Sequence, residues 1–197
     1  MQKLILASSS PRRLDLLKSI NYYPDEVISP DIDESPMPRE KPEKMASRLA
    51  LEKAKAINRE GFILACDTIV ATKAKFFDKA TSREQVEEYI NFYSGRRIYI
   101  HSAIAALKIE NGIITKTGQK LVTSIVKFKR FSIDEIKYYL DSGNGVGAAG
   151  GFAVQGLGET LIQWMSGSFS GMVGLPLCET VSLLKGIGFN NESKSTR

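Results

Sequence analysis

The first twenty residues hold a short apolar run that is followed at once by a polar loop and a helix start. Residues 3–7 are typical of a short buried strand, and the loop follows from Ser8 to Ser10. Pro11 stands where helices favour proline, at the first helical position, with Ser10 as N-cap, and we expect this helix to reach about Ile20. A strand, a short loop and a helix N-terminus form the layout of an anion-binding site.

The next segments repeat this alternation. Pro42 can open a second helix, which we expect to reach about Arg59 with Gly61 as its C′ residue. Residues 62–65 then predict another buried strand, with Cys66–Thr68 at or near its end.

The second half of the chain is richer in strands. Ser82 with Gln85, and Ser132 with Glu135, match the capping box that opens a helix. Residues 143–158 contain seven of the 16 glycines, which indicates tight turns or a close approach of backbone to a ligand. We expect helices at 83–93, from 133 to about 143 and at 176–186, and strands at 98–109, from 113 onward and at 122–131. The whole predicts an α/β sheet core with a cleft, as a single domain at 1–189 with a polar tail at 190–197.

Composition excludes several classes of protein. Among 197 residues there are two cysteines, Cys66 and Cys178, far apart, and a single histidine, His101. A disulfide framework, a zinc site built on histidines and a Ser-His-Asp triad therefore lack material. We expect Cys66 to be a small buried residue and His101 to be structural. The Walker phosphate-loop pattern is absent as well.

The charge balance allows anionic partners without requiring nucleic acid. Lys and Arg number 27 against 22 Asp and Glu, a net charge of +5, but the basic residues are dispersed. One cluster, Lys127, Lys129 and Arg130, is interleaved with Phe128 and Phe131. We expect a small-molecule anion and no nucleic-acid partner. Because no apolar run is long enough for a membrane helix or a signal sequence, we expect a cytoplasmic protein with no membrane partner.

Two arginines stand where helices disfavour cations. Arg12 and Arg13 lie in the first turn of the expected helix, where the helix dipole is already positive. A bound phosphate would reverse this penalty, because guanidinium groups and free backbone N–H groups both suit its oxygens. The alternative is an ordinary solvated pair of arginines.

Asp67 is the strongest candidate for a chemical role. It follows the apolar run 62–66, and a carboxylate there must be paired, hold a metal or act as a base. The acidic loop Asp31, Asp33 and Glu34 offers further oxygen ligands for a hard divalent cation. The alternative for Asp67 is an ordinary turn after a strand. Lys53 and Lys79 could each reach a polyphosphate, although a single lysine is more often a solvated surface residue.

Taken together, these segments resemble the Maf family of nucleoside triphosphate pyrophosphatases. They occur in the family's order and span nearly the whole chain. The matching segments are 4–13, Asp31–Glu34, Arg48–Ala54, Asp67–Val70, Asp78–Ala80, Ser94–Arg96, Ala149–Gly156, Gly167–Ser168 and Val173–Leu177.

The resemblance implies an enzyme that hydrolyses a nucleoside triphosphate to the monophosphate and pyrophosphate with Mg²⁺ or Mn²⁺. It also implies a mixed sheet core with flanking helices and two lobes around a central nucleotide-binding cleft, and it allows a homodimer. Thr68 and Gln155 resemble the branch that acts on dTTP and UTP. The implied roles are Asp67 as general base and metal ligand, Glu34 as metal ligand, Ser8, Arg13, Lys53 and Lys79 as substrate-binding residues, and Arg12, Thr68 and Gln155 as specificity residues.

The sequence departs from the family pattern at three positions. Ile98 stands where the family usually has His, Asn144 where it has Glu, and Ala148 where it has Lys. None of these positions is among the implied base and phosphate ligands, so we expect activity. The alternative is a weakly catalytic nucleotide-binding regulator linked to cell division.

Overall fold

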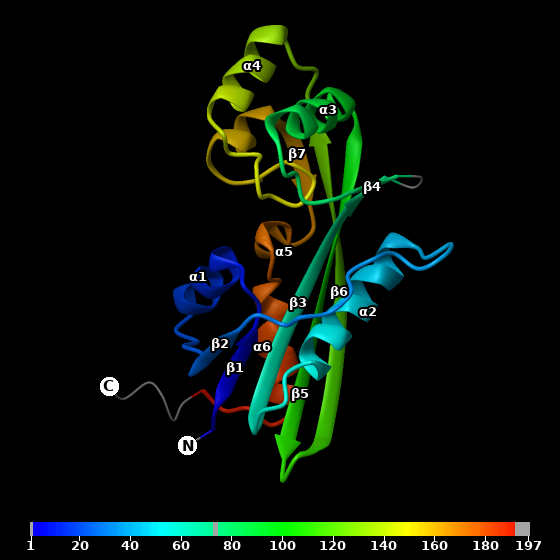
Figure 1. Cartoon of the computed structure of the whole chain (residues 1–197). Helices are drawn as coiled ribbons and strands as arrows, with labels where there is room; N and C mark the ends of the chain where they lie inside the picture. Colours follow the sequence, from blue (N-terminus) through cyan, green and yellow to red (C-terminus); the bar gives the residue numbers. More distant parts are fainter. Residues whose placement is uncertain (1, 73–74, 192–197) are drawn as a thin grey trace.

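The computed structural model describes residues 2–72 and 75–191 and contains one mixed sheet with helices packed on both faces (Figure 1). Its strands are β1 (Leu4–Ala7), β2 (Glu26–Ile28), β3 (Gly61–Ala71), β4 (Phe76–Phe77), β5 (Arg97–Glu110), β6 (Ile113–Phe128) and β7 (Ile162–Ser166). Its helices are α1 (Pro11–Ser19), α2 (Pro42–Lys55), α3 (Arg83–Tyr93), α4 (Ile133–Asp141), the 3-10 helix η1 (Gly156–Leu161), α5 (Phe169–Val173) and α6 (Leu177–Gly186). The predicted α/β class with a mixed sheet and flanking helices is confirmed.

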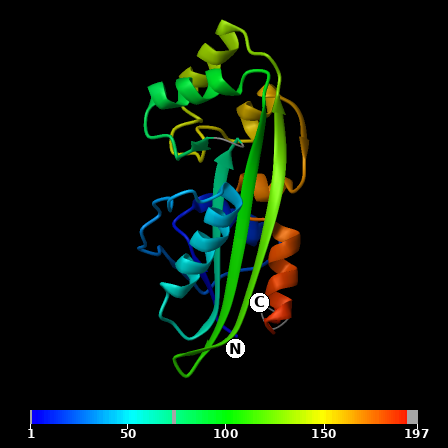
Figure 2. The same ribbon diagram turned by 90° about the vertical axis from the view of Figure 1, so that its right-hand side faces the viewer.

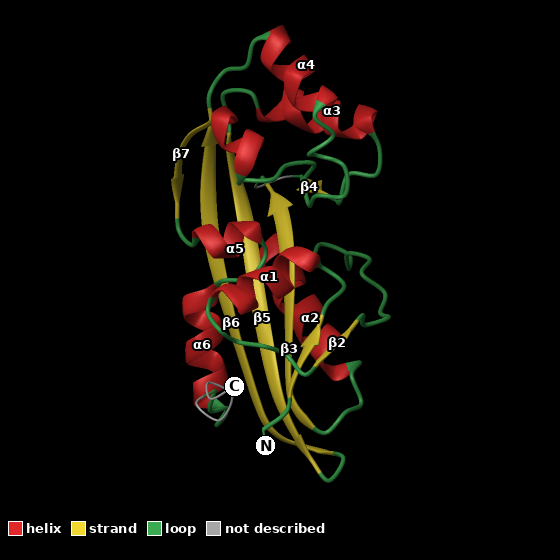
Figure 3. Cartoon of the chain, turned by 90° about the vertical axis from the view of Figure 1, so that its left-hand side faces the viewer, coloured by secondary structure: helices red, strands yellow, loops and turns green. Residues whose placement is uncertain are grey.

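Strand lengths explain the elongated shape. The sheet order is β2-β1-β3-β5-β6-β7, with the short β4 paired to β3. The two short strands β1 and β2 run parallel to their neighbours, whereas the long strands β3, β5 and β6 form antiparallel pairs. Strand β1 ends at Ala7, opposite Ala65 of β3. The long strands continue beyond this point and form part of a second lobe (Figure 3).

Each lobe has its own apolar core. In the first lobe, Leu4 and Leu6 face one side of the sheet and Ile5 and Ala7 face the other, as strand alternation requires. These two faces pack against α6 and α2, which lie on opposite sides of the sheet in Figure 2. In the second lobe, α3, α4 and the ends of the long strands enclose a cluster that includes Tyr93, Phe128 and Tyr139.

Three expected boundaries are wrong. The second helix ends at Lys55, and Gly61, with φ +120°, is the first residue of β3 rather than a helix C′ residue. The strand predicted to end near Asp67 continues to Ala71, because β5 pairs with it along its whole length. The two strands expected after residue 113 are a single strand, β6, for the same reason.

Other expectations are confirmed. Strand β1 and helices α1, α3, α4 and α6 lie where the sequence predicts them. Ser132 and Glu135 form a complete capping box. At Ser82 only one of the two capping-box bonds forms. The Ser82 side chain accepts from the N–H of Gln85, but the Gln85 side chain accepts from the N–H of Thr81 and not from that of Ser82. The short elements β2, β4, η1, β7 and α5 were not predicted.

The structure describes the N-terminal end from residue 2 and the C-terminal end as far as residue 191. The first two residues of the predicted tail, Asn190 and Asn191, hydrogen-bond to Gln2 and to the carbonyl of Asn21. The rest of the tail, 192–197, lies outside the described residues. Within the described ranges, no helix has the length and apolar character needed to cross a membrane.

Candidate active site

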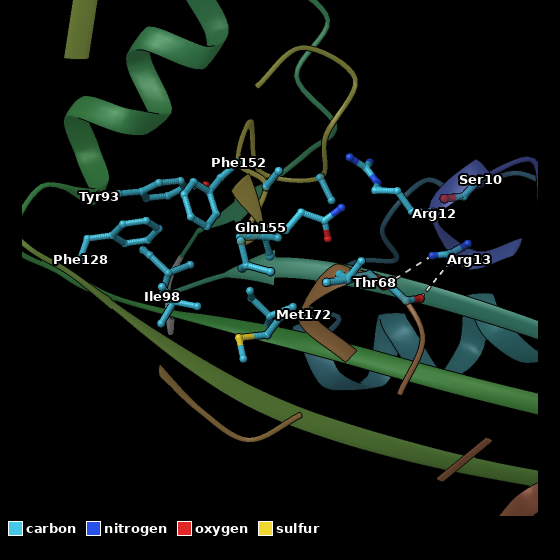
Figure 4. Close-up of a pocket in the computed structure, with 18 residues that line it drawn as sticks. Ser10, Arg12, Arg13, Thr68, Tyr93, Ile98, Phe128, Phe152, Gln155 and Met172 are labelled. Atoms are coloured by element: carbon cyan, nitrogen blue, oxygen red, sulfur yellow. Dashed lines mark hydrogen bonds between the residues drawn. The ribbon is translucent and has the colours of Figure 1, made fainter. Parts of the chain in front are cut away.

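A cavity lies where the two lobes meet. Figure 4 shows Arg12 and Arg13 at one end, aromatic rings at the other and Gln155 between them. The loop 8–10 and the N-terminus of α1 form the polar end. This loop directly follows β1, which ends at Ala7. The lining residues are Ser10, Arg12, Arg13, Thr68, Val70, Tyr93, Ile98, Ile100, Val126, Phe128, Ala149, Phe152, Ala153, Val154, Gln155, Met172, Val173 and Gly174.

Arg13 is held by neutral groups on all three guanidinium nitrogens. It donates from Nη1 to Ser8 Oγ (3.1 Å), from Nη2 to Thr68 Oγ1 (3.4 Å) and from Nε to the carbonyl of Gly174 (3.0 Å). In the described part of the chain, no ion pair neutralises Arg13 or its neighbour Arg12. Two uncompensated cations at a helix N-terminus make this end of the cavity a site for an anion.

Asp67 lies in the middle of β3 and is 5% exposed. Its Oδ1 accepts from Lys53 Nζ at 2.6 Å, and the same nitrogen lies 2.9 Å from Glu34 Oε1. Lys53 therefore joins the two carboxylates expected to be metal ligands. Asp67 Oδ2 is buried and has no hydrogen-bond partner among the described residues. A buried carboxylate oxygen without a partner is costly unless a ligand completes it.

The acidic loop contributes a single member to this cluster. Asp33 accepts from the N–H of Ser35 at 2.9 Å, Asp31 is exposed, and among the described residues Lys53 pairs with Glu34 and Asp67 only. The described residues contain no group of three metal-type ligands. Two carboxylates nevertheless suit a hard cation such as Mg²⁺ or Mn²⁺, which is commonly bound by one or two carboxylates with substrate phosphate oxygens and water completing the shell.

The second lobe contributes Gln155 and Lys79. Gln155 directly precedes η1 and is exposed at the cavity. The glycine-rich segment before it pairs with residues 78–80 through an isolated bridge between Lys79 and Ala149. Lys79 is exposed, and among the described residues it makes no hydrogen bond or ion pair with another predicted site residue. The structure thus forms two groups of predicted site residues. Arg12, Arg13, Thr68 and Gln155 line the cavity, with Ser8 bonded to Arg13, and Lys53 joins Glu34 to Asp67.

The apolar end of the cavity was not predicted as part of the site. Its walls include Tyr93 from α3, Ile98 from β5, Phe128 from β6 and Met172 from α5. Tyr93 donates its hydroxyl to the carbonyl of Gly150 at 2.8 Å, and burial raises the pKa of that hydroxyl. These residues come from four distant elements. Only Ile98 stood out in the sequence, as a departure from the family pattern, and the other three have the pattern of ordinary core residues.

Cys66 and His101 lie in structural environments, as expected from the sequence. Cys66 is fully buried, donates from Sγ to the carbonyl of Gly174 at 2.9 Å, and has its thiol pKa raised by burial. His101 Nδ1 lies 3.0 Å from Thr123 Oγ1, and burial lowers the pKa of the ring. Neither group has the environment of an activated nucleophile or base.

The fold and the cavity define a class of protein, namely mixed α/β proteins with a cavity between two lobes that is lined by arginines at one end. The chain belongs to a particular family within this class, the Maf-like proteins, whose family model matches residues 3–187.

The chain is similar to relatives named nucleoside triphosphate pyrophosphatase. It is 42% identical over 194 residues to the protein of Rickettsia rickettsii strain Sheila Smith, covering 96% of this chain and 90% of that protein. It is 43% identical over 190 residues to the Rickettsia felis protein, covering 94% and 93%. A solved HAM1 protein from Coxiella burnetii is 19% identical, with a TM-score of 0.45, covering 66% of this chain and 75% of that one.

Proposed function

We propose that the protein hydrolyses nucleoside triphosphates, dTTP and UTP in particular, to the monophosphate and pyrophosphate. The observation that carries this proposal is the buried Asp67 carboxylate, with its unpaired Oδ2, next along β3 to Thr68, which lines the cavity that also contains the uncompensated Arg12 and Arg13. The relatives' name, nucleoside triphosphate pyrophosphatase, agrees with that arrangement.

The triphosphate would bind at the polar end of the cleft. Ser8 and the backbone N–H groups at the start of α1 can donate to phosphate oxygens, and the guanidinium of Arg13 lies beside Ser8. Lys79, on the opposite lobe, is free to approach the outer phosphates as a point charge. In phosphoryl transfer, such positioning and charge neutralisation supply most of the catalysis.

Asp67 would act as the general base. Its Oδ2 can accept a proton from a water molecule whose oxygen bonds to the α-phosphorus as the bond to the α,β-bridging oxygen breaks. The proton stays on Asp67 or passes to solvent, and pyrophosphate leaves with the bridging oxygen.

The two carboxylates would also hold the metal. Glu34 and Asp67 are the ligands that this chain offers to Mg²⁺ or Mn²⁺, and Lys53 keeps both carboxylates in place. The bound cation would neutralise negative charge on the phosphates. In this proposal Lys53 orders the carboxylates, in addition to the phosphate-binding role expected for it from the sequence.

The nucleobase of the substrate would lie between the arginines and the apolar end of the cleft. Gln155 can match a thymine or uracil edge, because an amide both donates and accepts, and Thr68 and Arg12 line the same space. The apolar walls favour a flat ring over a charged group.

Two of the three basic residues considered for nucleic acid bond to other parts of the protein. Lys127 bonds to the carbonyl of Gly95, and Lys129 pairs with Glu135. These internal contacts support a small-molecule substrate rather than a phosphate backbone. A homodimer remains part of the proposal, to be tested by the protein's mass in solution.

The test is a panel of nucleoside triphosphates with Mg²⁺ or Mn²⁺, in which monophosphate and pyrophosphate are quantified. We expect turnover of dTTP and UTP that is lost in Asp67→Asn, and a changed preference among nucleotides in Gln155→Ala. Turnover of 7-methyl-GTP instead would keep the chemistry but overturn the assignment of Thr68 and Gln155. Nucleotide binding without turnover would favour the alternative function, a weakly catalytic nucleotide-binding regulator.

A further inference from the structure

The segment that carries Glu34 is poorly supported by packing. Residues 29–41 join β2 to α2 without helix or strand, and within them Pro36, Met37 and Pro38 are exposed (Figure 1). A groove separates this segment from α2, lined by Ile32 and Met37 on one side and by Lys55 on the other. Burial of apolar surface therefore contributes little to holding Glu34 in place.

A single side chain of α2 provides most of the polar attachment. Arg48 donates from Nε and Nη2 to the two oxygens of Glu40, at 2.7 and 2.8 Å, and from Nη2 to the carbonyl of Ser35 at 3.1 Å. Its Nη1 donates to Glu52, one turn further along α2, at 2.9 Å. Glu40 in turn accepts from the N–H of Met37 at 3.0 Å.

These contacts are sheltered from solvent. The side chains of Arg48 and Glu40 are 17% and 9% exposed, and their two-bond geometry is the strongest form of an arginine–carboxylate pair. The hydrogen bonds from Arg48 hold the pKa of Glu40 below its usual range. A pair of this kind resists screening better than one at the open surface.

The attachment lies next to the metal-type cluster. Ser35, whose carbonyl Arg48 holds, directly follows Glu34, whose carboxylate Lys53 holds. Arg48 and Lys53 both come from α2, so one helix fixes two consecutive residues of the segment. Glu34 itself is 57% exposed, and its position depends on these two contacts.

We propose that Arg48 is a positioning residue that, through Glu40 and Ser35, holds Glu34 beside Asp67 and so sets the affinity for the divalent cation. The inference rests on the proposed function. Outer contacts that orient metal ligands typically change metal affinity by about 10–100-fold when they are lost. Lysine keeps the charge of Arg48 but cannot form the same fork of bonds.

The test compares wild type with Arg48→Lys and Glu40→Gln. We expect the Mg²⁺ concentration for half-maximal turnover to rise about tenfold in both variants, with a smaller change in kcat at saturating Mg²⁺. Amide hydrogen exchange should become faster at Ser35 and Met37 while it is unchanged in β3 and β5. Arg83→Lys is the matched control, because Arg83 pairs with Asp141 at 2.7 Å on the other lobe, and it should change neither quantity.

The two readouts separate the inference from the proposed function. Unchanged exchange at Ser35 and Met37, or an unchanged Mg²⁺ requirement in an active enzyme, would overturn the role of Arg48. If wild type turns over no nucleotide, the proposed function fails, and calorimetry with Mn²⁺ and a non-hydrolysable dTTP analogue then tests the role of Arg48 by measuring metal affinity directly. Metal affinity weakened in Arg48→Lys would support the positioning role, and equal affinity would overturn it.

Discussion

Lys53 and Asp67 form a buried ion pair, with 8% and 6% of their side chains exposed. Removing one member of such a pair leaves a buried charge without its partner, which typically costs about 3–5 kcal/mol. We therefore expect Lys53→Met to lower the free energy of unfolding by that amount, as measured by urea titration.

The double variant Lys53→Met, Asp67→Asn is the control, because it removes both charges together. It should be clearly more stable than Lys53→Met alone. Equal stability of the two variants would mean that the ion pair is not what holds this part of β3.

At the same scale, sequence reasoning found the charged site residues but not how they pair. Arg13 and Asp67 were singled out because a cation at a helix start and a carboxylate after an apolar run conflict with local preference, whereas Glu34 was one of three acidic loop residues and its role was implied by the family resemblance. The contact of Lys53 with Asp67 joins residues 14 apart along the chain and depends on how α2 packs on β3. The walls Tyr93, Phe128 and Met172 carry no such conflict, so only the fold could bring them to the site.

Among the elements, the glycine-rich segment shows why two glycines in similar conformations differ in importance. Gly143 and Gly150 have φ of +70° and +65°. A Cβ at Gly143 would meet nothing within 4 Å, whereas one at Gly150 would lie 2.7 Å from Val70 Cγ1 and 2.9 Å from Tyr93 Oη. We expect Gly143→Ala to cost about 1–2 kcal/mol from backbone strain alone, and Gly150→Ala about 1–3 kcal/mol more from overpacking.

Urea unfolding of both variants measures this difference. Nucleotide turnover should fall further in Gly150→Ala, because Val70 and Tyr93 line the cleft. If the two variants lose equal stability, the segment is not tightly packed against β3 and α3.

Helices were easier to predict than strand ends for a physical reason. Caps and prolines act locally, so Ser132 with Glu135 and Pro11 fixed their helix starts from sequence alone. The end of β3 depends instead on β5, which pairs with it as far as Ala71. Strands β2 and β4 contain only three and two residues, and they form because they pair with β1 and β3.

At the scale of the whole molecule, the two lobes share long strands but have separate cores, so a ligand in the cleft would connect them. Arg13 belongs to the first lobe and Gln155 to the second, and both line the same cavity. We therefore expect a non-hydrolysable dTTP analogue, at about 100 times its Kd, to raise the free energy of unfolding by about 2.7 kcal/mol. Hydrogen exchange should slow in both lobes, at the start of α1 and around η1.

Two variants show which lobe supplies which part of the binding. Arg13→Met should abolish protection in both lobes, because the phosphates lose the cation that neutralises them. Gln155→Ala should keep protection at α1 and lose it around η1, because only the contact with the base is removed. Protection confined to the first lobe in the wild-type protein would contradict the bridging model, since the substrate would then be held by its phosphates alone.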